Sequence, residues 1–344
     1  MANKTLHYDK INYGFSLLKM LMAFEVLLAH FCNWKEYEDM RFLWPFREFV
    51  SLAVPCFMIL SFYLTQRSFL LKDNAKFKER LIRLCIPQFG WAVIYYVVYL
   101  LLDLFFHAGL HGGISSLFWQ IITGHSRYLN ATMWFQFDII VISILFHFIF
   151  TVFDEKRGYV TLIVLTLFSY FMQISGINWA LFGELEFELK FPLGRIFEMI
   201  PYAFLGFTLR YFDILEKMKK YRYILMPLCV VVFFSGFYIT LPEFKDFGFS
   251  GFIKPYLAFP IIAFAYLTPL EYVPLTIKKA ILHITNYSLG IYCIHRLINT
   301  LITFIVPELP LRSFERCILL YAICYLACFL IDRIKDRKVK LLIN

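Results

Sequence analysis

Residues Ile11–Asn33 read INYGFSLLKMLMAFEVLLAHFCN, and this stretch decides the fold. It is long enough to cross a bilayer as a helix, which takes about 20 mostly apolar residues. Three ionisable side chains, Lys19, Glu25 and His30, interrupt the apolar run. Because an ionisable group is costly to hold in hydrocarbon, its presence in a span indicates a functional site. The stretch predicts a retained first transmembrane helix, and not a cleaved signal peptide.

The spacing of these residues predicts which of them act together. Lys19 and His30 lie on one face of a helix, roughly 16 Å apart along its axis, because each residue advances the helix by about 100° and 1.5 Å. Glu25 points away from that face. A cation and a titratable imidazole on one face could line a path through the membrane. Alternatively, Lys19 could extend to the interface and His30 could bond a neighbouring carbonyl group.

The composition places the chain among membrane proteins. Of its 344 residues, 60% are hydrophobic, 20% are aromatic and only 17% are charged. Soluble domains contain about 45–50% apolar and about 25% charged residues. In a membrane protein, the net charge of +9 does not by itself indicate an anionic partner. The distribution of the basic residues between the loops is more informative.

The cysteines and histidines do not predict a metal site. The eight cysteines lie mostly inside apolar runs and form no close CxxC pair, which is typical of small buried side chains and not of a disulfide framework. His107 and His111 have a ligand-like spacing, but no carboxylate or cysteine completes the site. We therefore expect no metal and no tightly bound cofactor.

Apolar runs of about 20 residues recur along the whole chain. We predict an all-α bundle of about ten spans in a single membrane domain covering residues 1–344, with no soluble appendage. The segment 114–124 is apolar but too short to span. The predicted spans are 11–33, 47–66, 84–106, 131–153, 159–181, 192–211, 222–241, 252–270, 281–305 and 313–332.

The basic residues predict the orientation of these spans. With the N-terminus inside, the inner segments hold 22 of the 34 Lys and Arg residues and the outer segments hold nine. The other three, Lys19, Arg195 and Arg296, lie within spans. Lys and Arg concentrate in the cytoplasmic loops of membrane proteins. Both termini are therefore predicted to be cytoplasmic.

Six short blocks within or beside the predicted spans contain polar residues or proline. Several place charged or hydroxyl-bearing residues at helical spacing within apolar sequence. In chain order the blocks are KMLMAFEVLLAH (19–30), VPCFMILSFY (54–63), RLIR (80–83) followed by Pro87, MWF (133–135), RIFEMIPYAFLG (195–206) and NYSLGIYCIH (286–295).

Taken in order, these six blocks resemble the membrane-bound acyltransferase 3 family. Lys19 and His30 match its R/K-x10-H signature, and Arg80 and Arg83 match its cytosolic RxxR motif. The chain departs from the family at Phe62, where a glycine is usual. It also lacks the histidine that often precedes the tryptophan block.

The resemblance implies an enzyme of the cell inner (plasma) membrane. It implies transfer of an acyl group, most often acetyl, from cytosolic acyl-CoA as co-substrate to a hydroxyl of a carbohydrate in the cell envelope or of an exported polysaccharide. The expected partners are acyl-CoA, the carbohydrate and the bilayer, and no nucleic acid. The sequence does not determine the oligomeric state.

The residues give this chemistry a physical basis. His30 could accept a proton from a sugar hydroxyl as a general base, or carry the acyl group itself. Lys19 could stabilise the thioester oxyanion or bind acyl-CoA phosphates. Arg80 and Arg83 could bind those phosphates, since guanidinium groups bind them bidentately. Alternatively, both arginines are ordinary positive charges of a cytoplasmic loop.

The acceptor site is expected near the outer half of the bundle. Arg195 and Glu198 should form an ion pair within one helix, which either binds the acceptor or only neutralises buried charge. Trp134 is either a platform for a sugar ring or an interfacial anchor. Asp138 has no motif context and is interpreted as an interior polar contact. The substrate-binding candidates are Trp134, Arg195, Glu198, Ser288, Tyr292 and His295.

A transporter or flippase for a polar or glycan substrate is the alternative hypothesis. In that case Lys19, Glu25 and His30 would be coupling residues. Two observations argue against it: the two halves of the sequence show no evident repeat, and the RxxR motif has no obvious use in transport. Transfer of a labelled acetyl group from acetyl-CoA to a carbohydrate would distinguish the two functions.

Overall fold

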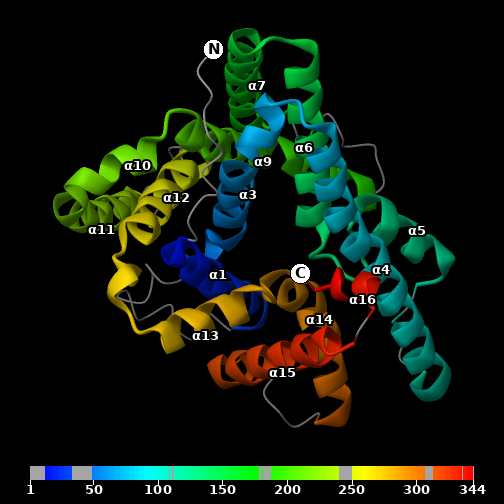
Figure 1. Ribbon diagram of the computed structural model, residues 1–344. Coiled ribbons are helices and arrows are strands. Elements are labelled where there is room, and N and C mark those ends of the chain that lie inside the picture. The colour runs from blue at the N-terminus through cyan, green and yellow to red at the C-terminus, as the bar shows by residue number, and fades with distance from the viewer. Residues whose placement is uncertain are drawn as a thin grey trace.

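The computed structural model describes residues 12–32, 49–107, 109–110, 112–177, 180, 187–239, 250–306, 313–334 and 336–343. These residues form helices and connections and contain no strand, which confirms the predicted all-α class (Figure 1).

Helices of 18 or more residues account for most of the described chain, and each predicted span overlaps one of them. Six of them, α1, α4, α6, α7, α14 and α15, are long and apolar enough to cross a membrane. That all ten cross it remains a prediction. The helices are α1 (Tyr13–Phe31), α3 (Ala53–Leu70), α4 (Asn74–Phe106), α6 (Trp134–Val152), α7 (Glu155–Ile174), α9 (Phe187–Tyr211), α11 (Arg222–Ile239), α12 (Ser250–Leu267), α14 (Ser288–Ile305) and α15 (Phe314–Asp332).

Shorter helices connect the long ones. The segment predicted to be too short to span forms α5, a helix of 10 residues. Two others, α10 and α13, lie between long helices and carry lysines of the predicted inner loops. The short helices are α5 (Ile114–Thr123), α10 (Ile214–Met218), α13 (Leu275–Thr285) and α16 (Arg337–Lys340).

Helix α1 occupies the centre of the bundle (Figure 1). It packs against α3, α12, α13, α14 and α15. Its first turn is capped by Asn12, whose Oδ1 accepts from the Phe15 N–H at 3.0 Å. Gly14 allows α12 to approach closely, since a Cβ on Gly14 would lie 1.7 Å from the Ala265 carbonyl oxygen.

Side chains from the C-terminal helices bind the backbone of α1. The Thr285 hydroxyl donates to the Ser16 carbonyl at 2.6 Å, and the Tyr321 hydroxyl donates to the Met20 carbonyl at 3.3 Å. Hydrogen bonds between helices contribute to packing in hydrocarbon, where lipid offers no partner. These bonds join the first helix to the last third of the chain.

Helices α3 and α9 form the most extensive helix contact in the described part of the chain. A glycine makes it possible, because a Cβ on Gly206 would lie 2.1 Å from the Ile59 carbonyl oxygen. Small residues permit this close approach of helix backbones in membranes. The contact holds α9, which carries Arg195 and Glu198, against the bundle.

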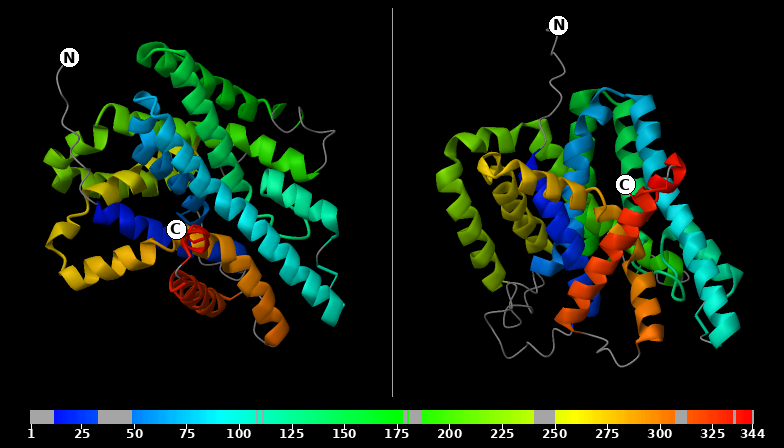
Figure 2. Two further views of the ribbon diagram at one scale, coloured as in Figure 1. Left: turned by 45° about the vertical axis from the view of Figure 1, so that its right-hand side comes forward. Right: turned by 60° about the horizontal axis from the view of Figure 1, so that its bottom comes forward.

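Two connections that are predicted to be inner loops lie on the same side of the bundle. The turn between α3 and α4 and the short helix α10 lie at the same end of the bundle (Figure 2, right). Both were predicted to be inner loops because of their lysines, among them Lys72 and Lys219. The direction in which the bundle sits in the membrane remains a prediction.

Cysteine labelling tests that direction. We expect Lys220→Cys to react with a membrane-impermeant maleimide only from the cytoplasmic side, and Tyr128→Cys only from outside. Both parent side chains are exposed. A Cys85→Ser background removes the only native thiol among the described residues that is not buried. The reverse labelling pattern would contradict the predicted orientation.

Candidate active site

Two intramembrane histidines from opposite ends of the chain meet inside the bundle. His30 lies in the last turn of α1, and His295 lies in the first half of α14. Their rings stack with centroids 5.6 Å apart and an interplanar angle of 19°. The sequence indicated each histidine as a candidate separately, and the structure brings them together.

The hydrogen bonding of His295 defines its protonation. The side chain is completely buried, and its Nδ1 lies 2.6 Å from the Tyr292 carbonyl oxygen. A carbonyl oxygen only accepts, so Nδ1 carries the proton and Nε2 has a free lone pair. Within the described chain Nε2 has no hydrogen-bond partner. His295 is therefore oriented as a proton acceptor.

His30 differs from its neighbour in accessibility. Its side chain is exposed and forms no hydrogen bond with the described residues. Of the two imidazoles, His30 is the one that a substrate can reach directly. The rings of Phe31 and Tyr292 lie 5.8 and 6.0 Å from the ring of His295 and cover the buried side of the pair.

Arg296 supplies a positive charge beside the histidine pair. It acts electrostatically on both imidazoles, and it makes no ion pair with a described carboxylate. A cation placed beside the reacting groups can stabilise negative charge that develops on an oxygen. The site thus combines a proton acceptor with a group suited to an oxyanion.

A tyrosine from α4 is inserted into α14 next to His295. The hydroxyl of Tyr95 donates to the Cys293 carbonyl oxygen and accepts from the Leu297 N–H, both at 2.9 Å. These two backbone groups would pair directly in an undisturbed α-helix. Inserted side chains of this kind bend helices. Tyr95 therefore sets the local geometry of the turn that carries His295.

The intrahelical pair of Arg195 and Glu198 is present as predicted, with 2.6 Å between Nη1 and Oε2. The guanidinium also lies over two rings, 5.2 Å from Trp134 and 5.1 Å from Phe191. A cation over an aromatic face is an attractive arrangement. Arg195 thus covers the ring of Trp134, and the roles of these residues in acceptor binding remain predictions.

Asp138 lies in the interior of the bundle. It lies one turn beyond Trp134 on α6 and is completely buried, yet neither carboxylate oxygen has a hydrogen-bond partner in the described chain. Its interior position agrees with that interpretation from the sequence, but its polar contact in the described chain is electrostatic and not a hydrogen bond. Asp138 interacts electrostatically with Arg195 and Glu198. A buried carboxyl without a hydrogen bond is costly to hold in a fold, so Asp138 is a candidate for a role at the site.

His125 is a further buried histidine that the sequence motifs do not indicate. His125 lies in the connection between α5 and α6, with its ring stacked on Phe191 at 4.7 Å. Burial lowers the pKa of His125 to about 4, so its imidazole is neutral at neutral pH. The signal was the polar connection HSRYLNAT, whose residues Ser126, Asn130 and Thr132 are also buried.

The late block of α14 contributes anchoring contacts. The Tyr292 hydroxyl donates to the Thr132 carbonyl oxygen. The Ser288 hydroxyl donates to the Lys19 carbonyl oxygen at 3.5 Å. Both hydroxyls are used in packing the bundle, and their roles in substrate binding remain predictions.

Lys19 and His30 lie on one uninterrupted helix, roughly 16 Å apart along the axis. The half-buried side chain of Lys19 is therefore three turns from the histidine pair. At this distance the geometry does not support a direct role of Lys19 in a reaction at His30, and its binding of acyl-CoA phosphates remains a prediction.

The two arginines of the RxxR motif point to different surroundings. The Arg80 guanidinium faces the bundle and donates to the Ser61 hydroxyl at 3.0 Å and the Ser143 hydroxyl at 3.1 Å. It also lies 5.4 Å from the ring of Phe62, the residue that stands in place of the usual glycine. Arg83 is exposed and pairs with Glu79 at 2.6 Å. Their binding of CoA remains a prediction.

No group of three or more His, Cys, Asp or Glu side chains that could hold a metal ion occurs in the described ranges.

Comparison with known proteins identifies the class. The family model Acyl_transf_3, described as an acyltransferase domain, matches residues 12–333, nearly the whole chain. The protein belongs to this family of acyltransferases, as the six motif blocks predicted. No curated protein and no solved structure matches the chain.

The different surroundings of the two motif arginines predict different effects on stability. Arg80→Lys removes hydrogen bonds to the buried Ser143 hydroxyl and the partly buried Ser61 hydroxyl and should destabilise the fold by about 1–3 kcal/mol. Arg83→Lys keeps an exposed charge pair and should change stability by less than about 0.5 kcal/mol. Thermal unfolding in detergent measures both. Equal losses would contradict the inward placement of Arg80.

The insertion of Tyr95 predicts a selective loss of activity. Tyr95→Phe keeps the ring but leaves the Cys293 carbonyl and the Leu297 N–H without their shared partner. We expect acyl transfer to fall about tenfold through kcat, because small misplacement of a reacting group is costly. Tyr99→Phe is the matched control, since Tyr99 lies one turn further along α4 and its hydroxyl contacts Thr300 of α14. If Tyr95→Phe were as active as Tyr99→Phe, Tyr95 would not position the turn that carries His295.

Proposed function

We propose that the protein is an inner (plasma) membrane O-acyltransferase that uses cytosolic acyl-CoA, in the first place acetyl-CoA. The acceptor is a hydroxyl of a carbohydrate in the cell envelope or of an exported polysaccharide. The family match supports acyl transfer. The observation that carries the chemistry is the stacked pair of His30 and His295 among apolar helices.

The pair supports a direct transfer. The acceptor oxygen attacks the thioester carbonyl carbon, the C–S bond breaks, and the hydroxyl proton passes through an imidazole to the leaving thiolate. His30 is the accessible imidazole and takes the proton from the acceptor. His295 packs against it with its Nε2 lone pair available. The charge of Arg296 favours the oxyanion of the tetrahedral intermediate.

A covalent route uses the same residue. An imidazole nitrogen of His30 attacks the thioester carbonyl carbon and displaces the thiolate, which forms an acyl-imidazole. The acceptor hydroxyl then attacks that carbonyl carbon and releases the imidazole. Rapid quenching with labelled acetyl-CoA and no acceptor distinguishes the routes, because only the covalent route leaves the label on His30.

The donor and the acceptor approach the pair from different sides in this proposal. The donor phosphates bind near the inner end through Arg80, Arg83 and Lys19, where basic residues concentrate. The acceptor contacts Arg195, Glu198 and Trp134, with Ser288, Tyr292 and the buried Asp138 shaping the space between them. The thioester carbon then meets the hydroxyl at His30.

The central test removes the accessible histidine. His30→Ala and His30→Gln should lower acyl transfer by about 100- to 10,000-fold, the range of general acid–base catalysis. His147→Gln is the control. His147 lies near the C-terminal end of α6, where it is stacked on Phe77 and hydrogen-bonded to Asn74. Label transferred from acetyl-CoA to membrane glycans, read by mass spectrometry, measures the activity.

The same assay separates the alternatives. Full activity of a well-inserted His30→Ala, together with an inactive His295→Ala, would move the chemistry to α14. An absence of label on any carbohydrate in wild-type vesicles would contradict the transferase and favour transport.

A further inference from the structure

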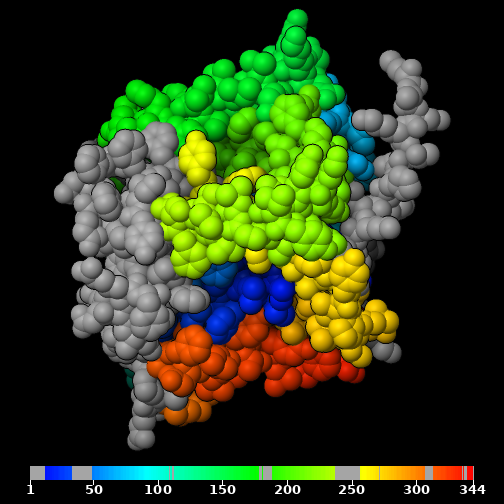
Figure 3. Space-filling model, turned by 90° about the vertical axis from the view of Figure 1, so that its left-hand side faces the viewer, coloured from blue at the N-terminus to red at the C-terminus, as the bar shows by residue number. Residues whose placement is uncertain are grey.

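A cavity of about 300 Å³ lies between α1, α11 and α12, away from the histidine pair. Its walls are almost entirely hydrocarbon. In Figure 3, α1 is visible in blue at the bottom of a hollow beneath yellow-green α11; gold α13 and orange-red α15 border this hollow but contribute no residue to the lining of the cavity. Representative lining residues are Leu18 and Leu21 of α1, Cys229 and Phe233 of α11, and Ile261 and Phe264 of α12. We call this cavity the α1 groove.

The α1 groove is open to its surroundings. Leu21, Val230 and Phe264 line it, and each is more than a third exposed. On the surface of a membrane-spanning bundle those surroundings are lipid hydrocarbon. Apolar cavities do not retain water. A hydrocarbon chain is therefore the occupant that matches the lining.

The groove lies on the opposite face of α1 from the proposed active site. Gly14, Leu18 and Leu21 share one face by helical spacing, whereas Lys19 and His30 lie about 150° around the helix. The groove is thus separate from the route of the donor and the acceptor.

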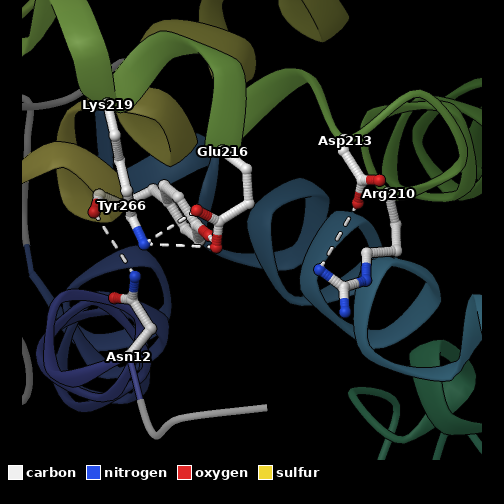
Figure 4. Close-up of polar contacts among 6 residues, drawn as sticks. All are labelled: Asn12, Arg210, Asp213, Glu216, Lys219 and Tyr266. Carbon is white, nitrogen blue, oxygen red and sulfur yellow. Dashed lines mark hydrogen bonds and ion pairs between the residues drawn. The ribbon is translucent and has the colours of Figure 1, made fainter. Parts of the chain in front are cut away.

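One end of the groove has the features of a membrane interface. Gly14 and Thr268 lie at this end, next to the partly exposed Tyr13, while Tyr266 is buried against Phe15 and Tyr63. Tyrosines gather at the level of lipid head groups. The end is also fixed in place, because Asn12 Nδ2 donates to the Tyr266 carbonyl oxygen at 3.3 Å, and the Tyr266 hydroxyl donates to Glu216 (Figure 4).

Two lysines flank this end. The Lys278 ammonium lies 5.3 Å from the ring centroid of Tyr13, and the Lys219 ammonium lies 4.8 Å from that of Tyr266. Lys219 also pairs with Glu216 at 3.0 Å. Lysines at the surface of a bilayer attract anionic head groups by about 1 kcal/mol each. Because Glu216 compensates the charge of Lys219, Lys278 is the lysine that would attract a lipid phosphate at this level.

We propose that the α1 groove binds one acyl chain of an anionic phospholipid of the inner leaflet, with its phosphate near Lys278. The volume is at the lower end of ligand sites, which are about 300–1,000 Å³, so it accommodates part of one chain. The bound chain fills the space beside α1 and stabilises the helix from the side opposite His30.

Native mass spectrometry of the full chain tests the proposal. The protein is extracted from vesicles of phosphatidylglycerol and phosphatidylethanolamine. Wild type should retain one phosphatidylglycerol molecule, and Cys229→Trp should reduce its occupancy at least about tenfold, because the indole fills the groove. Val231→Trp is the matched control, since Val231 is 58% exposed on α11 and does not line the groove.

A second arm leaves the residues that line the groove unchanged. Lys278→Ala should lower the preference for phosphatidylglycerol over phosphatidylethanolamine by about fivefold, in proportion to the lost lysine. In the wild-type protein, phosphatidylglycerol with a diazirine in its chain should label Phe233 and Phe264 more than Val231. This labelling keeps the proposal testable even if Cys229→Trp fails to fold.

Two results would overturn the proposal. One is equal retention of phosphatidylglycerol by the folded Cys229→Trp and Val231→Trp variants, or equal labelling of the groove and Val231. The other is retention of an isoprenyl phosphate in place of phospholipid when both are supplied. Neither readout depends on acyl transfer, so the lipid site and the proposed function fail independently.

Discussion

Hydrogen bonds to the backbone of α1 hold the rest of the structure in register. Thr285, Ser288 and Tyr321 lie on three different C-terminal helices, and each donates a hydroxyl proton to a carbonyl oxygen of α1. Lipid offers no competing partner for these groups. The bonds place α14 beside α1, and that placement brings His295 to His30. The candidate active site is therefore a consequence of how the first and last thirds of the chain dock.

Buried polar groups separate into two kinds in this bundle. Arg316 is almost completely buried, but its guanidinium bonds to Asn299 at 2.9 Å and Thr303 at 2.6 Å, which satisfies the charge within the fold. Asp138 and Nε2 of His295 are equally buried and have no hydrogen-bond partner in the described chain. Unsatisfied buried groups destabilise a fold. Their location on the helices that carry the motif blocks supports a role in chemistry.

The two faces of the central helix carry different features. Its one face carries Lys19 and His30, and its other face lines the apolar α1 groove. A helix held by hydroxyl donors along one side and by a lipid chain along the other keeps His30 in a defined position. Rigid placement of a proton acceptor is what a positioned transfer requires.

The sequence by itself determined the helical fold, the order of the helices, the family, and the contacts that form within one helix. Arg195 and Glu198 pair because residues three apart share a helix face, whatever the surroundings. Only the tertiary structure decided which faces meet. Arg80 and Arg83 are also three apart, yet one enters the bundle and the other faces outward beside Glu79. The insertion of Tyr95 of α4 into α14 and the stack of His30 on His295 depend on helix rotation and docking, which local periodicity does not encode.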